Sequence, residues 1–196
     1  MNGALYTVGV LAFHGDVAEH VSALEKAAHV IKKPVSVRLV RTQGDLRGLN
    51  GLVIPGGEST TLQKLIEREG MVQAMQDLRA VFGTCAGAIL MAKKVHGASD
   101  GQRTLELMDI TVDRNAYGRQ TESFEEDIET DLGPLRAVFI RAPHILDVGK
   151  GVHILAQTSG RVLACEQRSG DHYYLASTFH PELTTTVFHE HFLRRL

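Results

Sequence analysis

Short apolar segments alternate with helical patterns throughout the first half of the sequence. Runs with the length and β-branched character of buried strands occur at residues 7–13, 35–40, 51–54 and 80–82. Helical spacing of apolar residues follows at 17–28, where Asp16 is a candidate cap, and at 60–69, 71–78 and 88–93. Parallel strands need long crossover connections, usually helices, so this order favours an α/β fold with a mostly parallel sheet covered on both faces.

The second half has a different rhythm, with short strands separated by glycine-containing turns. These strands are expected at residues 108–112, 137–140, 152–157, 162–166 and 173–178, and a last amphipathic helix at 185–194. Their close spacing predicts antiparallel strands that extend the sheet. No linker or internal repeat interrupts the sequence, so we expect one domain over residues 1–196.

Charge and the N-terminal segment exclude several classes of function. The formal net charge is −2 and basic residues form no run, which argues against nucleic acid as a partner. The N-terminal apolar segment has no basic leader and reaches Gly15 and Asp16 too soon for a signal peptide or a membrane span. We therefore expect a cytoplasmic protein.

The two cysteines lie in different surroundings, and a disulfide framework is not expected from so few. Cys165 lies in an apolar, strand-like stretch, where a small buried hydrophobe is the simplest interpretation. Cys85 has a glycine two positions away on each side, in G-T-C-A-G between a strand and a helix.

This pentapeptide has the layout of a nucleophile elbow, a sharp turn that exposes its central side chain above a sheet. The helix that follows would favour the Cys85 thiolate, and the backbone N–H of Ala86 could donate to an oxyanion. The alternative is that a cysteine among glycines only fits a cramped turn.

A second element lies far along the chain, where Phe179-His180-Pro181-Glu182 ends an apolar strand. Pro181 disfavours the α region for His180, which predicts an extended chain with the side chains of His180 and Glu182 on the same side. Glu182 could then orient the imidazole while His180 exchanges a proton with Cys85. A hydrogen-bonded histidine at a strand end is the alternative for His180 taken alone.

The combination of G-T-C-A-G with F-H-P-E resembles the class I, or triad, glutamine amidotransferases. Four further segments resemble the glutaminase subunits of pyridoxal 5'-phosphate synthases within that family. They are P-G-G-E-S-T-T at residues 55–61, R-N-x-x-G-R-Q at 114–120, I-R-A-P at 140–143 and T-F-H-P-E-L at 178–183. The similarity covers essentially the whole chain.

The resemblance implies a three-layer, flavodoxin-like α/β sandwich that hydrolyses L-glutamine to L-glutamate and ammonia with a triad of Cys85, His180 and Glu182. It implies no cofactor, and ammonia that passes to a separate (β/α)8-barrel synthase subunit in a large ring-shaped complex for vitamin B6 synthesis. The residues that it places against L-glutamine are Gly57, Glu58, Ser59, Arg114, Ile140 and Arg141.

Several of these residues have physical roles to offer. The N–H of Gly57 could complete an oxyanion hole with that of Ala86, because glycine permits close approach. Arg114 or Arg141 could bind the substrate carboxylate, and Glu58 its ammonium group. The alternatives are a simple turn for the glycine, a helix cap for Glu58 and solvated surface for each arginine.

His14 departs from the family pattern, which usually has glutamine in a strand-end motif beside the active site. Because that position resembles one linked to partner contact and oxyanion-hole ordering, His14 is a candidate for activation; a surface histidine in a turn is the alternative. The ten histidines show no metal-ligand spacing, since His189 and His191 diverge on a helix, so no metal site is expected.

Two other functions remain open at this point. One is an amidotransferase subunit that serves another acceptor, or a cysteine hydrolase of similar fold, against which residues 114–120 and 140–143 argue. The other is a non-catalytic assembly subunit in which His14 has uncoupled the site. The complete set of Cys85, His180 and Glu182 argues against that second function.

Overall fold

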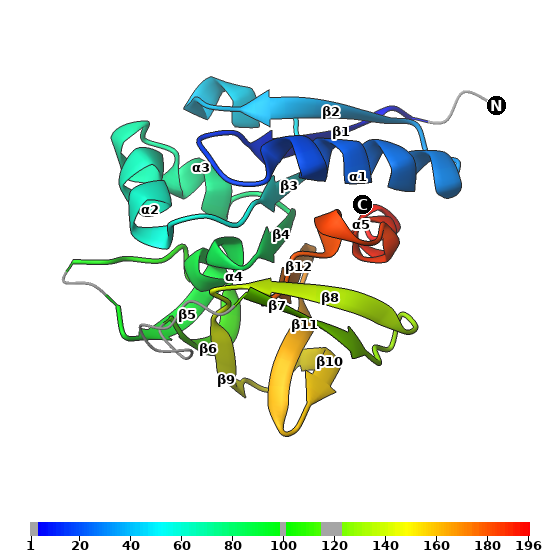
Figure 1. Ribbon diagram of the computed structural model, residues 1–196. Helices are drawn as coiled ribbons and strands as arrows, with labels where there is room; N and C mark the ends of the chain where they lie inside the picture. The colour runs from blue at the N-terminus through cyan, green and yellow to red at the C-terminus, as the bar shows by residue number, and fades with distance from the viewer. Residues whose placement is uncertain (1–3, 99–100, 115–122) are drawn as a thin grey trace.

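A large β-sheet with helices on both faces forms the body of the protein (Figure 1). The computed structural model describes residues 4–98, 101–114 and 123–196. One helical layer holds α1 (Val17–Val30) and α5 (Val187–Leu193), and the other holds α2 (Ser59–Arg68), α3 (Val72–Gln76) and α4 (Ala86–Met91). None of the helices in these ranges has the length and apolar character needed to cross a membrane.

Five parallel strands build the half of the sheet that lies between these layers. Their order is β2 (Val35–Val40), β1 (Tyr6–Leu11), β3 (Gly51–Ile54), β4 (Ala80–Thr84) and β12 (His172–Ser177). Each of these strands is followed by an α-helix or a short 3-10 helix. The carboxyl ends of all five strands therefore lie along one edge.

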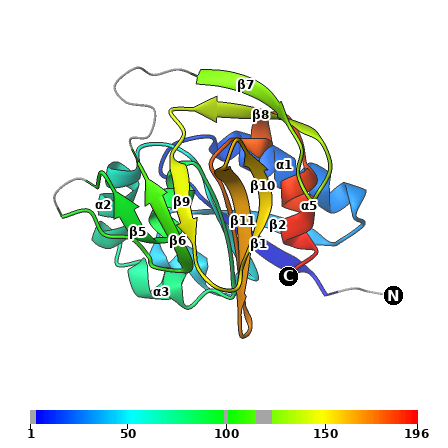
Figure 2. The same ribbon diagram turned by 90° about the horizontal axis from the view of Figure 1, so that it is seen from below.

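The other half of the sheet is mixed and curls away from the helices (Figure 2). It continues from β12 through β11 (Arg161–Ser169), β9 (His144–Val148), β6 (Met108–Asp113) and β5 (Ala92–His96), with β10 (Val152–Thr158) paired to β11. A separate antiparallel hairpin contains β7 (Ser123–Ile128) and β8 (Leu135–Ile140). Two short 3-10 helices, η1 (Gln43–Leu46) and η2 (Pro181–Leu183), complete the described elements.

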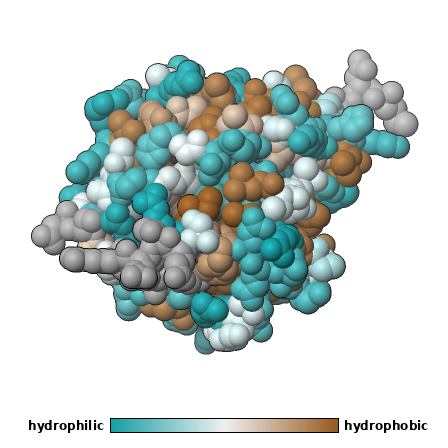
Figure 3. All heavy atoms as spheres, viewed as in Figure 1, coloured by the Kyte–Doolittle hydropathy of each residue, from teal (hydrophilic) through white to brown (hydrophobic). Residues whose placement is uncertain are grey.

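Alternation along the central strands divides the core into two clusters. On β4, Val81 packs with the α2–α4 layer and Phe82 with the α1–α5 layer. Ile54 and Val53 on β3 divide in the same way. Successive side chains of a strand point to opposite faces, so strands that are apolar throughout are what a sheet covered on both faces requires. On the face seen in Figure 3, hydrophilic and hydrophobic residues are interspersed.

The predicted three-layer α/β architecture is present, with three strands more than the sequence indicated. The helix expected over 88–93 is displaced: α4 ends at Met91, and β5 begins at Ala92. Strand β7 alternates exposed polar residues with more buried ones, and in β9 Asp147 interrupts the apolar residues, so neither has a long apolar run. The predicted helix over 71–78 shortens to Val72–Gln76.

Candidate active site

The register of the parallel strands brings distant loops to one place. Thr84 at the end of β4 pairs with Ser177 at the end of β12, and Gly83 pairs with Ile54 at the end of β3. Strand β1 lies beside β3 on the other side. The segments that follow these four strands therefore meet at the carboxyl edge of the sheet, and they contain His14, Gly57, Cys85 and His180.

Cys85 occupies a strained turn between β4 and α4. Its φ is 50° and its ψ −105°, a conformation rare for a residue with a side chain, and its N–H donates to the Ser177 carbonyl at 2.9 Å. The neighbouring glycines are required by packing. A Cβ on Gly83 would lie 2.6 Å from the carbonyl carbon of Gly87, and one on Gly87 would lie 2.1 Å from the Ile54 oxygen. This geometry is that of a nucleophile elbow.

His180 and Glu182 are in direct contact, as the sequence suggested, but through a different backbone. Nδ1 of His180 lies 2.8 Å from Oε1 of Glu182, and both side chains are buried. The extended chain expected after His180 was wrong: Pro181 begins the 3-10 helix η2. Proline is well suited to a first helical position, because its fixed φ is already helical and no N–H is lost there.

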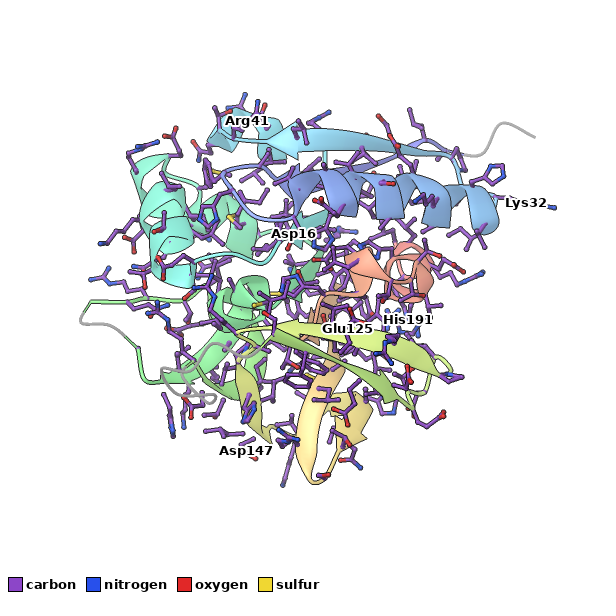
Figure 4. All side chains as sticks on the ribbon, in the orientation of Figure 1. Asp16, Lys32, Arg41, Glu125, Asp147 and His191 are labelled. Carbon is purple, nitrogen blue, oxygen red and sulfur yellow. The ribbon has the colours of Figure 1, made fainter. Side chains whose placement is uncertain are left out.

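Asp16 supplies a second carboxylate to the same imidazole. It begins α1 without capping it through its side chain; instead its Oδ2 lies 3.0 Å from Nδ1 of His180. Figure 4 labels Asp16, which lies near the middle of that view where the β1–α1 loop meets the helix. The sequence indicated Asp16 as a helix cap and did not connect it with His180.

These contacts stabilise a protonated His180 beside an ionised Glu182. Burial would lower the pKa of His180, but hydrogen bonds of its Nδ1 with Asp16 and Glu182, and its interaction with nearby Cys85, outweigh burial and raise that pKa above its ordinary value. Burial would raise the pKa of Glu182, yet hydrogen bonds with His180 and His20 lower it to about 2. An imidazole that is readily protonated, between carboxylates and beside a thiol, is suited to take the proton of a sulfur nucleophile.

Two buried histidines extend this cluster behind Glu182. Nε2 of His20, on α1, lies 3.3 Å from Oε1 of Glu182 and 3.1 Å from Oγ1 of Thr84. Nδ1 of His20 lies 2.9 Å from Nε2 of His189, on α5. The sequence did not indicate any of these three contacts. One signal was available, because His20 is a polar residue on the otherwise apolar stripe of a helix.

Two glycines after β3 lie against active-site rings. A Cβ on Gly56 would be 2.4 Å from Cε1 of His180, and one on Gly57 would be 2.5 Å from Nδ1 of His14. Gly57 has a φ of 139°, which also favours glycine. His14 is therefore half-buried over the Gly57 backbone and is not a freely exposed surface histidine.

Two of the candidate substrate residues, Glu58 and Arg114, contact each other. Glu58 caps α2 by accepting from the N–H groups of Thr60 and Thr61, and it also forms an ion pair with Arg114. The helix-cap role considered for Glu58 is thus present. Burial would raise the pKa of Glu58, but the hydrogen bonds with Thr61 and Thr60 lower it to about 2.

Ile140, Arg141 and Ser59 are the remaining candidate substrate residues that the structure describes. The carbonyl oxygen of Ile140 lies 3.8 Å from Sγ of Cys85, which places the end of β8 beside the thiol. Arg141, the next residue, is exposed and has a φ of 46°. Ser59 accepts a hydrogen bond from Gln102 at 3.1 Å, and Gln102 also contacts Arg114. Residues 115–120 of the R-N-x-x-G-R-Q motif lie outside the described residues.

One group in the described ranges has ligand atoms close enough for a cation. Asp16, His180 and Glu182 place theirs within 4.8 Å of one another. Both carboxylates approach the same ring nitrogen, so a proton on Nδ1 satisfies them without a metal. This cluster is better explained by proton chemistry than by metal binding.

Comparison with known proteins agrees with this geometry. The model of the SNO glutamine amidotransferase family matches residues 10–196. The pyridoxal 5'-phosphate synthase subunit PdxT of Korarchaeum cryptofilum is 46% identical, over 96% of this chain and 98% of that protein. The protein of the same name from Pyrococcus horikoshii is 41% identical, over 96% and 98%.

A solved structure gives the same result for the fold. The crystal structure of a glutamine amidotransferase, 41% identical, superimposes with a TM-score of 0.80 over 96% of this chain and 97% of that one. The α/β fold class and the family predicted from the motifs are confirmed. The chain belongs to the SNO glutamine amidotransferase family.

Proposed function

We propose that this chain hydrolyses L-glutamine to L-glutamate and ammonia, as the glutaminase subunit of a pyridoxal 5'-phosphate synthase. The observation that carries the proposal is the position of Cys85, on its elbow, beside the buried pair of His180 and Glu182. Family membership and the names of the PdxT relatives support the substrate and the pathway.

In the first half of the reaction, His180 takes the Cys85 proton and the thiolate attacks the side-chain amide carbon of glutamine. The tetrahedral oxyanion accepts hydrogen bonds from the N–H groups of Ala86 and Gly57. His180 then returns the proton to the departing amine, the C–N bond breaks, and ammonia leaves a γ-glutamyl thioester on Cys85. Glu182 holds the imidazole and stabilises its charged form.

In the second half, water completes the cycle. His180 removes a proton from the water that attacks the thioester, and the C–S bond breaks to release glutamate and the Cys85 thiol. The raised pKa of His180 supports the two steps in which it takes up a proton, because the resulting imidazolium is stabilised. Neither half of this reaction needs a redox step or a cofactor.

Substrate binding involves Gly57, Glu58, Ser59, Arg114, Ile140 and Arg141 in this proposal. Glu58 and Arg114 are paired with each other, so the two charges of the substrate's α-amino acid group would meet complementary charges at one point. His14 lies against Gly57, so a change in its position would alter the candidate oxyanion donor directly. This contact supports a role for His14 in activation.

The proposed partner is a separate (β/α)8-barrel synthase subunit that receives the ammonia within a large ring-shaped complex. The relatives are named as subunits of a synthase, which supports a partner of this kind. The expected cytoplasmic location is consistent with the two free cysteines and remains a prediction, as does the single domain over residues 1–196.

The proposal is tested by measuring glutamate and ammonia release from glutamine, with and without the cognate synthase subunit. We expect partner-stimulated release by the wild type and its loss in Cys85→Ala, with Cys165→Ala as the matched control that keeps activity. Equal release by the wild type and Cys85→Ala would overturn the assignment of the nucleophile. If the wild type releases no glutamate or ammonia even with its partner, a non-catalytic assembly subunit would be favoured.

A further inference from the structure

His20, on α1, contacts the Glu182 carboxylate of the proposed triad. Its ring is fully buried on the inner face of α1. Oε1 of Glu182 accepts from both imidazoles, with His180 Nδ1 at 2.8 Å and His20 Nε2 at 3.3 Å. Within the described part of the chain, Oε2 of Glu182 makes no hydrogen bond. The orientation of this carboxylate therefore depends on both histidines.

The positions of the partners determine which nitrogen of His20 carries a proton. Nε2 faces a carboxylate oxygen and the Thr84 hydroxyl, so a lone pair there would repel the carboxylate, whereas an N–H would donate to it. At the other nitrogen, Nδ1 of His20 and Nε2 of His189 share one proton across 2.9 Å.

His189 completes a directional chain of hydrogen bonds. Burial, followed by the effect of nearby His20, lowers the pKa of His189 to about 3, so this ring is neutral at physiological pH. If its single proton is on Nε2, His189 donates to Nδ1 of His20, which leaves the His20 proton on Nε2 and directed at Glu182. The order of donation is then His189 to His20 to Glu182.

We infer that His20 is a positioning residue of the glutaminase reaction: its Nε2–H orients the anionic Glu182 carboxylate on His180, and His189 selects the tautomer that makes this possible. The inference rests on the proposed function of the triad. It extends the machinery to two residues that do not touch the reacting atoms. It also connects α1 and α5 to the elbow, because Thr84 directly precedes Cys85.

A purely structural role is a poor explanation for this arrangement. Two imidazoles and a carboxylate in one buried cluster require desolvation, which apolar side chains of similar size would avoid. The same site already has aromatic packing, with Phe82 edge-on to His20 and to His189. An apolar ring at position 20 would therefore satisfy packing, but it would leave Oε1 of Glu182 with one donor fewer.

Two amide substitutions separate positioning from packing. In His20→Gln the side-chain NH2 reaches the place of Nε2 and can still donate to Glu182. In His20→Asn the shorter amide reaches only the place of Nδ1, so it contacts His189 and not Glu182. Both variants are compared with wild type and Cys85→Ala in the complete complex with the synthase subunit. His191→Gln, on the same helix as His189 but bonded to Glu166, is the control.

We expect His20→Asn to lower kcat about 10- to 100-fold with KM for glutamine unchanged within about twofold, a range typical of outer groups that orient active residues. His20→Gln should retain kcat within about threefold. The acid limb of the pH profile should move to higher pH in His20→Asn, because Glu182 loses a donor. In a Glu182→Gln background, His20→Asn should add less than about a twofold loss, because both changes break one chain.

Several results would overturn the inference while leaving the proposed function intact. Equal kcat in His20→Gln and His20→Asn, or a full additional loss in the Glu182→Gln background, would mean that His20 does not act through Glu182. If neither variant folds, imidazole 15N shifts of the wild type decide, since a His20 without a proton on Nε2 contradicts the proposed chain. Failure of the wild type itself to release glutamate would instead refute the proposed function.

Discussion

The Oδ2 atom of Asp16 lies 3.0 Å from the Nδ1 atom of His180, so the imidazole of this site meets two carboxylates, not one. The two differ in environment. The Glu182 side chain is fully buried, whereas that of Asp16 is 32% exposed at the start of α1. Coulombic effects are screened at an exposed position, so Glu182 should be the dominant partner and Asp16 the weaker one.

Asp16→Asn is therefore expected to lower kcat/KM by about three- to tenfold, well short of the loss in Glu182→Gln, which should be about 100-fold or more. The physical reason is the removal of one negative charge that stabilises the His180 imidazolium. For the same reason the alkaline limb of the pH profile should move to lower pH, because the pKa of His180 falls.

Glu19→Gln is the matched control for this prediction, since Glu19 is an exposed acidic residue one turn along the same helix. Its kinetics should remain those of the wild type. A loss in Asp16→Asn as large as that in Glu182→Gln would reverse the order of the two carboxylates.

The two cysteines should differ sharply toward an alkylating reagent. Cys165 is fully buried on β11, and burial raises its pKa to about 12, so it offers almost no thiolate at neutral pH. Cys85 lies at the elbow beside His180. We expect iodoacetamide to modify the native wild type once, at Cys85, as located by peptide mass spectrometry.

Cys85→Ser should then take up no reagent in its native state, whereas the same variant unfolded in denaturant should take up one equivalent at Cys165. Rapid native modification of Cys165 would show that β11 opens far more readily than its packing indicates.

The sequence could predict those features of the site that depend on residues close together in the chain. The glycines around Cys85 predicted a tight turn because only glycine fits beside Ile54 and Met91, and the structure contains that crowding. The contact of His180 with Glu182 was also predictable, since they are two positions apart, although the 3-10 helix η2 and not an extended chain brings them together.

The remaining contacts depend on tertiary packing. His20 is 64 residues from Thr84 and 169 from His189, and only the register of the sheet with α1 and α5 against it brings them together. Strands β5, β7 and β9 escaped the sequence analysis for a related reason. Their residues are half-exposed, so pairing with neighbouring strands, not an apolar run, specifies them.

Gly87→Ala tests the crowding at the elbow. The new Cβ would lie 2.1 Å from the Ile54 carbonyl oxygen, a backbone atom that cannot move alone, so the turn or β3 must shift. We expect a decrease of about 3 kcal/mol in the free energy of unfolding, at the upper end for overpacking, and loss of glutaminase activity. Denaturant titration and the coupled assay measure the two effects.

Gly44→Ala is the comparison, because its Cβ would meet only Oγ1 of Thr42, at 3.7 Å. Its stability should stay within about 0.5 kcal/mol of the wild type. If Gly87→Ala were equally mild, the close approach of the elbow to β3 would not be a constraint on the sequence.

His189 should make the protein sensitive to mild acid. Its folded pKa is lowered to about 3 by burial and by His20, from an ordinary value of 6.5. Between these values the unfolded chain binds a proton at this position and the folded chain does not, so stability is lost as pH falls below 6.5. His180 does not contribute in that window: its pKa is raised, so it is protonated in both states there.

One such group changes the free energy of unfolding by at most about 1.4 kcal/mol per pH unit. Measurements between pH 6 and 5 avoid the range in which carboxylates titrate. Substituting His189→Gln should reduce the slope of unfolding free energy against pH by close to one proton, although stability at pH 8 falls. His29→Gln, an exposed histidine on α1, should leave the slope unchanged. An identical slope in the wild type and His189→Gln would mean that His189 takes up its proton in the folded state, which the buried chain from His189 to Glu182 does not permit.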